Sequence, residues 1–140
     1  PKVDGLNFSF SGLKTQILYF IQKNVAQNPN FIEENKEDIC ASIQYTIINI
    51  LMDKLKLAVA ETGINQIAIG GGVSANSGIR TTLKETEQKY GWKTYIPKFE
   101  YTTDNAAMIA TTASYHFMHR PVPSLDFAVI PSEPLSSHGF

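Results

Sequence analysis

The segment 64–72, "INQIAIGGG", determines the predicted fold. Its short β-branched run stops at three glycines, a pattern typical of a buried strand, which we expect at residues 66–70. Residues 75–90 follow with a helical pattern, and "WKTYIP" (92–97) predicts a second strand before a last helix at residues 105–119. This order of strand, helix, strand and helix predicts an α/β fold with a parallel sheet and a right-handed crossover.

Two further helices are predicted upstream of this segment. Residues 7–10, "NFSF", indicate a short strand, and Ser11 is placed to cap a helix that ends near residues 27–30. A longer helix begins around residues 32–38 and ends at Gly63. Its apolar residues recur about once in four positions, so we expect it to form the core. They are Ile39, Ile43, Ile47, Leu51, Leu55 and Val59.

The composition is ordinary for a soluble globular domain. The 140 residues suffice for one core, and no apolar run approaches the length of about 20 residues that crosses a bilayer, so no membrane association is expected. A formal net charge of −1 provides no global positive field for nucleic acid, so any such contact must be local. The single cysteine, Cys40, excludes an internal disulfide and favours a cytoplasmic location, and Cys40 and Tyr45 are expected to pack beside the long helix's apolar stripe.

The ends of the chain indicate a piece of a larger protein. Residues 1–10 do not begin with Met and lack the pattern of a signal peptide. We therefore expect a fragment whose remaining strands lie upstream. Residues 1–120 are predicted to form the core of a partial domain, and residues 121–140 a proline-rich tail with one short edge strand at residues 127–130.

The predicted sheet brings two distant segments to one edge. Ligands of parallel sheets bind outside the carboxyl ends of the strands. The first strand leads into "GGGVSAN" (70–76) and the second into "KFEYTTD" (98–104). If both strands belong to one parallel sheet, Asn76 and Asp104 are expected to border the same crevice.

The glycines of the first segment allow two interpretations. Gly70, Gly71 and Gly72 would expose backbone N–H groups and a helix N-terminus, which suit a phosphate or a nucleoside. Neither the dinucleotide pattern nor the P-loop pattern is present. The pattern alone favours the second interpretation, a tight turn in which Ser74 or Asn76 caps the next helix.

Asp104 also allows two interpretations, because several capping residues precede the last helix. If Thr102 or Thr103 is the N-cap, Asp104 lies in the first turn and is free to bind a cation. Otherwise Asp104 is itself the N-cap and accepts from the N–H of residue 106 or 107. The pattern alone favours this capping role.

The other charged candidates favour structural roles. His116 and His119 share one helix face, but His116 lies about 18 Å along the helix axis from Asp104, so the histidines cannot share an ion with it. Lys14 and Arg80, each in the first turn of a helix, suit either an anion or a solvated face, and we favour the latter. No Ser–His–Asp, H-E-x-x-H or Cys–His arrangement is present, so the sequence does not indicate a self-contained hydrolase, and no catalytic residue is assigned.

Four segments occur in a fixed order along the chain: "FSFSGLKT" (8–15), "CASIQ" (40–44), "GGVSANSGIR" (71–80) and "TTDNAAMIA" (102–110). Together they resemble the C-terminal part of bacterial tRNA N6-adenosine threonylcarbamoyltransferases, once described as O-sialoglycoprotein endopeptidases. The similarity spans roughly residues 6–119. The resemblance implies an actin-like, sugar-kinase-type (ASKHA) fold of two ribonuclease-H-like lobes, with this chain forming most of the second lobe's latter half.

The resemblance also implies a reaction and a site. Members transfer threonylcarbamoyl from threonylcarbamoyl-adenylate to N6 of the adenosine beside the tRNA anticodon. One divalent ion, iron or zinc, is held by two histidines of an H-x-x-x-H motif and by the aspartate of "TDNAAM", which is Asp104 here. By the same similarity Asn76 contacts the nucleotide-like substrate, and Gly71 and Gly72 allow its close approach.

The sequence departs from the family pattern in its missing half. It contains no H-x-x-x-H motif and none of the family's upstream glycine-rich segments, so the chain alone is expected to be inactive. The implied partners are tRNA, a subunit of related fold and a small ATPase. Two alternatives stay open: a sugar kinase or other ATPase of the same superfamily, and a non-enzymatic scaffold subunit. An upstream H-x-x-x-H motif would favour the transferase.

Overall fold

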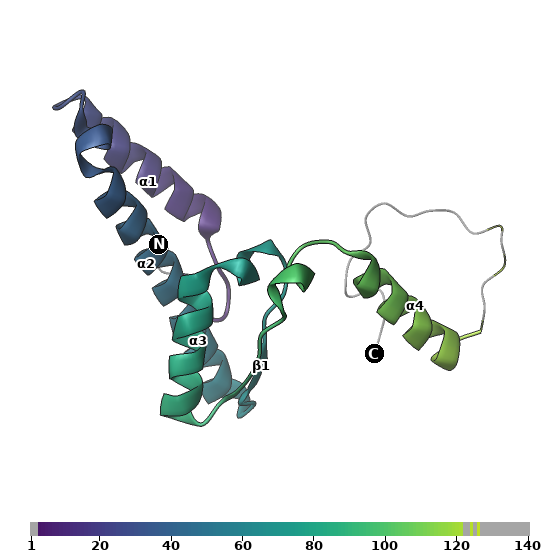
Figure 1. Cartoon of the computed structure of the whole chain (residues 1–140). Helices are drawn as coiled ribbons and strands as arrows, with labels where there is room; N and C mark the ends of the chain where they lie inside the picture. The colour runs from purple at the N-terminus through teal and green to yellow at the C-terminus, as the bar shows by residue number, and fades with distance from the viewer. Residues whose placement is uncertain (1–2, 122–123, 125, 127–140) are drawn as a thin grey trace. The chain divides into compact units, whose positions relative to one another are not determined.

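The computed structural model describes residues 3–121, 124 and 126 (Figure 1). The chain divides into two compact units, residues 1–103 and residues 104–140. The first unit contains helices α1–α3 and a small sheet, and the described part of the second contains helix α4 (Ala106–His119). Within the described residues, no helix is long and apolar enough to span a membrane. The predicted edge strand at residues 127–130 lies outside the described residues.

Two consecutive helices begin the first unit. Helix α1 (Phe10–Val25) is followed by α2 (Phe31–Thr62), which ends at Gly63 as predicted, with a left-handed φ of 70°. The predicted strand at residues 7–10 and the Ser11 cap are both wrong. Phe10 already belongs to the helix, because the Leu13 N–H donates to the Ser9 carbonyl at 3.2 Å and closes the first turn there.

The predicted parallel sheet is confirmed, with shorter strands. Strand β1 (Gln66–Ala68) pairs with β2 (Lys93–Tyr95) in the register Ile67 to Thr94, and helix α3 (Ser77–Tyr90) connects them. One more bond, from the Ile69 N–H to the Tyr95 carbonyl at 3.1 Å, continues the pairing beyond the strands. The first strand therefore ends two residues before the predicted limit of residue 70.

The core lies where α2, α3 and the sheet meet. Its buried apolar side chains are Met52, Ile67, Ile79, Leu83 and Trp92. Of the predicted stripe, Leu51, Leu55 and Val59 pack against this cluster, whereas Ile39 and Ile43 lie toward α1. The expectation that Cys40 and Tyr45 pack is wrong, since Cys40 is exposed and Tyr45 is 69% exposed. Gln44 bonds to Asn76 and Ile48 approaches Gly78, whereas Tyr45 lies on a different side of α2 from these two residues.

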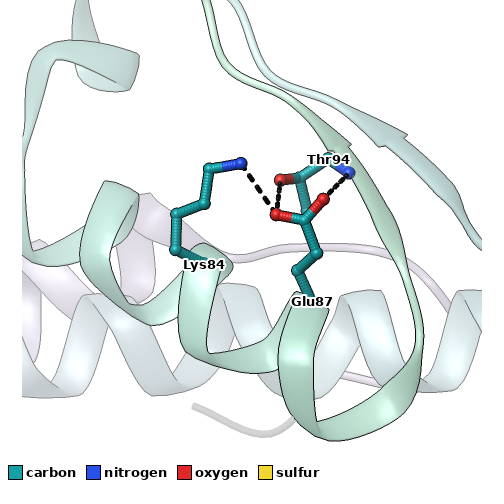
Figure 2. Close-up of polar contacts among 3 residues, drawn as sticks. All are labelled: Lys84, Glu87 and Thr94. Atoms are coloured by element: carbon teal, nitrogen blue, oxygen red, sulfur yellow. Dashed lines mark hydrogen bonds and ion pairs between the residues drawn. The ribbon is translucent and has the colours of Figure 1, made fainter.

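A network of hydrogen bonds links α3 to β2 (Figure 2). The Thr94 N–H donates to Glu87 Oε1 at 3.2 Å, and Thr94 Oγ1 and Lys84 Nζ donate to Glu87 Oε2 at 2.9 and 2.7 Å. The hydrogen bond from Lys84, followed by those from Thr94, lowers the pKa of Glu87 from its ordinary 4.5 to about 2. Glu87 is therefore a charged link between the crossover helix and the second strand.

Leu83→Ala should destabilise the first unit by about 2–5 kcal/mol, because Leu83 is fully buried and its loss leaves a cavity. Urea unfolding of the protein checks this value. Glu85→Ala removes an exposed side chain from the same helix and should change the unfolding free energy little. Equal effects of the two changes would contradict the placement of the core.

Glu87→Gln should remove a pH-dependent part of the stability. Because the folded pKa of Glu87 is depressed, its contribution is fully present above about pH 4.5 and is lost as the pH falls through about 2. The difference in unfolding free energy between the protein and the variant should therefore shrink across this window, as measured by urea unfolding at several pH values. Glu85→Gln, on the same helix, should show no such trend; a constant Glu87 difference would contradict the network.

Candidate functional site

The first candidate loop leaves β1 and enters α3. It contains a turn of 3-10 helix, η1 (Gly72–Ala75), preceded by Gly71 with φ 77° and ψ 171°, a conformation that favours glycine. Ser74 is buried, and both its N–H and its Oγ donate to the Gly71 carbonyl, at 3.0 and 2.7 Å. A Cβ built at Gly70, Gly71 or Gly72 would meet no atom within 4 Å, so the loop borders open space.

Asn76 caps α3, which confirms the turn interpretation of this loop. Its Oδ1 accepts from the Ile79 N–H at 3.1 Å, and its Nδ2 donates to Gln44 Oε1 at 3.3 Å. A Cβ at Gly78 would approach Ile48 Cδ1 to 2.6 Å, so glycine lets the first turn of α3 lie close against α2. The cap uses the amide oxygen, and one hydrogen on Nδ2 is left for a further acceptor.

The second candidate loop leaves β2 and ends at Asp104. It contains a 3-10 turn, η2 (Phe99–Tyr101), and a buried Thr102 whose Oγ1 donates to the Phe99 carbonyl at 2.8 Å. The N-cap of α4 is Asn105, whose Oδ1 accepts from the Met108 N–H at 3.1 Å. All three predicted caps, Thr102, Thr103 and Asp104, are therefore wrong, because the Asn105 amide takes this role.

Asp104 is consequently placed before the helix rather than in its first turn. Its side chain is exposed and lines a shallow hollow with Met108 and Ile109. The carboxylate thus has no capping bond to α4, because Asn105 provides the cap. Asn76 lies in the first unit and Asp104 in the second, so their expected proximity stays a prediction.

A carboxylate oxygen suits iron or zinc as one ligand of several. Among the described residues, no three His, Cys, Asp or Glu side chains gather as a metal-binding group. His116 and His119 are exposed near the end of α4, and the His119 ring stacks on Tyr115 with centroids 4.3 Å apart. This agrees with their structural interpretation. Asp104 therefore fits a metal site only with ligands from outside the described residues.

Arg80 joins the two loops, a role that the sequence analysis missed. Its Nε donates to the Ser74 carbonyl and its Nη2 to the Pro97 carbonyl, both at 2.7 Å, and its guanidinium carbon lies 6.0 Å from the centre of the Phe99 ring. The solvated-face interpretation is thus wrong for Arg80, although Lys14 is exposed as expected. Only the convergence of the two loops could reveal this, since nothing in the local sequence pairs residue 80 with residue 97.

A sequence model of the tRNA N6-adenosine threonylcarbamoyltransferase family matches residues 1–111. The chain belongs to this family. The match includes both candidate loops, the Arg80 link between them and Asp104, whereas His116 and His119 lie beyond it. It does not support the sugar-kinase alternative.

Individual relatives agree with this assignment. Proteins named tRNA N6-adenosine threonylcarbamoyltransferase are 71% identical over 116 residues in Christiangramia forsetii and 59% identical over 117 residues in Riemerella anatipestifer. These matches cover 83% and 84% of the chain and 34% of each relative. A relative of the same name in Cytophaga hutchinsonii is 50% identical over 133 residues, which is 94% of the chain and 39% of that protein. The chain thus spans about a third of the length of the relatives in Christiangramia forsetii and Riemerella anatipestifer.

Asn76→Ala should lower the unfolding free energy by about 1 kcal/mol, because the Ile79 N–H loses its cap acceptor. Asn76→Asp keeps an acceptor oxygen at the cap and should retain most of the stability. Chemical denaturation of both variants measures the difference. If the two substitutions destabilise the protein equally, the capping bond is not the source of the effect.

Proposed function

We propose that the chain is the C-terminal part of an enzyme that transfers threonylcarbamoyl from threonylcarbamoyl-adenylate to N6 of the adenosine next to the tRNA anticodon. The observation that carries this proposal is the pair of loops at the carboxyl ends of β1 and β2, joined through Arg80 and contained in the family match. A parallel sheet binds its ligands at this edge.

The proposed architecture is one part of a ribonuclease-H-like lobe in an actin-like, sugar-kinase-type (ASKHA) fold. The parallel β1–α3–β2 unit supports this assignment, since a parallel sheet with a crossover helix is a building block of such α/β folds. Two three-residue strands make a very small sheet. Coverage of about a third of the relatives leaves room for the remaining strands elsewhere in the full-length protein.

The first loop is the proposed adenylate-binding element. Gly71 and Gly72 border open space, so a nucleoside or phosphate group can approach their backbone without a side chain in the way. Asn76 is fixed by the cap and by Gln44, and its remaining Nδ2 hydrogen can donate to the ligand. Capping and ligand binding are compatible in this arrangement, because they use opposite ends of the amide.

Asp104 is the proposed metal ligand of the second loop. It is exposed and takes no part in the cap of α4, which Asn105 provides. When bound, iron or zinc would supply positive charge that polarises a carbamoyl or phosphate oxygen. The role of Asp104 is then to hold the ion rather than to act as a base, and no residue of this chain is proposed to transfer a proton.

The remaining parts of the proposal concern the complete protein. The net charge of −1 gives this part of the protein little attraction for tRNA, so the tRNA-binding surface is proposed to depend on the missing portion and on partner subunits. A subunit of related fold and a small ATPase are the proposed partners, and the cytoplasm is the proposed location. With a single proposed metal ligand, this chain alone is proposed to be inactive.

Asp104→Ala in the full-length enzyme should lower the bound metal per protein and the rate of threonylcarbamoyl transfer by roughly ten- to a hundredfold, because a ligand is lost while the cap at Asn105 remains. Metal analysis and a tRNA-modification assay measure both effects. Glu100→Ala removes an exposed carboxylate from the same loop and should change neither.

Two outcomes would contradict this assignment. Unchanged metal content in Asp104→Ala would show that the carboxylate is not a ligand. Failure of the unsubstituted, metal-loaded full-length protein to modify tRNA together with its partners would reject the proposed reaction itself.

A further inference from the structure

Arg80 occupies an unusual position for a cation in the first turn of a helix. A positive charge there faces the positive end of the helix dipole, which is unfavourable. Its side chain is half-buried, and none of the ion pairs between described residues includes it. Neither the helix dipole nor an ion pair with a carboxylate accounts for an arginine at this position. Its role is therefore sought in its hydrogen bonds to two backbone carbonyls.

Those contacts join segments that the sheet itself does not hold together. The last backbone bond between the strands runs from the Ile69 N–H to the Tyr95 carbonyl. Beyond it, among the described residues, no backbone–backbone hydrogen bond links residues 70–76 to residues 96–103. Arg80 crosses this interval, with its Nε on the Ser74 carbonyl and its Nη2 on the Pro97 carbonyl, each at 2.7 Å.

The chemistry of the guanidinium suits this bridging role. Its donors lie in one rigid plane and point in fixed directions, so two acceptors that bind it are held at a set separation. A lysine ammonium is a point charge on a flexible stem, so it holds two carbonyls with less directional control than a guanidinium. The Phe99 ring, 6.0 Å from the guanidinium carbon, adds a contact from the same second loop.

We propose that Arg80 is a positioning residue that sets the separation of two loop segments of the first unit, residues 70–76 and residues 97–103. One loop carries Gly71, Gly72 and Asn76, and the other leads along the chain to Asp104. The inference rests on the proposed function, because it assumes that the two loops act on one bound ligand. Transfer requires the reacting groups to be aligned, and small misplacements of a positioning element lower the rate steeply.

The test compares Arg80→Met, Arg80→Lys and Lys89→Met in the full-length enzyme. Lys89 is an exposed cation at the opposite end of α3 that lies 5.4 Å from the Tyr90 ring, so its change removes a comparable charge and ring contact away from the loops. For Arg80→Met we expect kcat for threonylcarbamoyl transfer to fall between roughly ten- and a hundredfold, with little change in KM and full metal content. Arg80→Lys should recover part of the rate, and Lys89→Met should match the unsubstituted enzyme.

Hydrogen exchange supplies a readout that does not depend on activity. The Tyr101 and Thr102 N–H groups bond within the second loop, to the Lys98 and Phe99 carbonyls. Without substrate, these amides should exchange roughly tenfold faster in Arg80→Met, whereas the amide of Leu83 in the centre of α3 should not change. If Arg80→Met fails to fold, the same comparison is made with Arg80→Lys, which keeps the positive charge but lacks the planar guanidinium.

Each result decides the inference. Faster exchange in the second loop with a lower kcat and retained metal supports it. Unchanged exchange, or faster exchange with unchanged transfer, overturns it. If the unsubstituted enzyme transfers no threonylcarbamoyl, the proposed function fails, and the exchange measurement still reports separately whether Arg80 holds the loop.

Discussion

The burial of one face of α3 is the constraint on which the site depends. Two strands of three residues each cannot form a stable sheet by themselves, because so short a ladder buries little apolar surface. Ile79 and Leu83 of α3 supply that surface by packing with Met52 of α2 and Ile67 of β1. The same helix begins at the first candidate loop, and through Arg80 it contacts the second. Helix α3 thus contributes both to the packing of the core and to the geometry of the candidate site.

This sharing makes the first turn of α3 serve several purposes at once. Asn76 satisfies an early N–H of the helix, Gly78 allows close contact with α2, and Arg80 reaches the carbonyls of both loops. Under the proposed function, a substitution here therefore changes both the stability and the binding of the ligand. A loss of activity in Asn76→Ala alone would not separate the two effects, whereas Asn76→Asp preserves the cap oxygen and changes the donor.

The sequence predicted the elements whose signals are local. The long helix ending at Gly63, the strand before the three glycines and the helix from Ser77 to Tyr90 all carry periodicity and a stop signal within their own residues. Ser11 failed as a cap because the turn closed two residues earlier, at Ser9. Where several residues can cap a helix, the alternative start positions differ little in free energy. The sequence pattern alone therefore does not select one of them.

The candidate site was predictable only to the level of its loops. The rule for parallel sheets brought residues 70–76 and 98–104 into consideration together, and the parallel pairing of β1 with β2 confirms its premise. The partners of Asn76 and Arg80, namely Gln44 and Pro97, lie 32 and 17 residues away in sequence. Such contacts depend on how helices and loops pack, and no periodic pattern in the sequence predicts them. The long helix shows the complementary case: Leu51, Leu55 and Val59 of its predicted stripe pack against the core, but the buried residue is Met52, and Cys40 and Tyr45 are exposed.

Helix α4, in the second unit, has apolar side chains that are largely exposed. Helix α4 has no buried residue, and Ile109, Phe117 and Met118 are each at least two-thirds exposed. A helix of 14 residues has little stability from its backbone alone, so it requires tertiary packing of its apolar side chains. Asp104 immediately precedes this helix and its Asn105 cap. Since only Asn105 separates Asp104 from α4, we expect any surface that packs against this helix to restrict the position of the carboxylate as well.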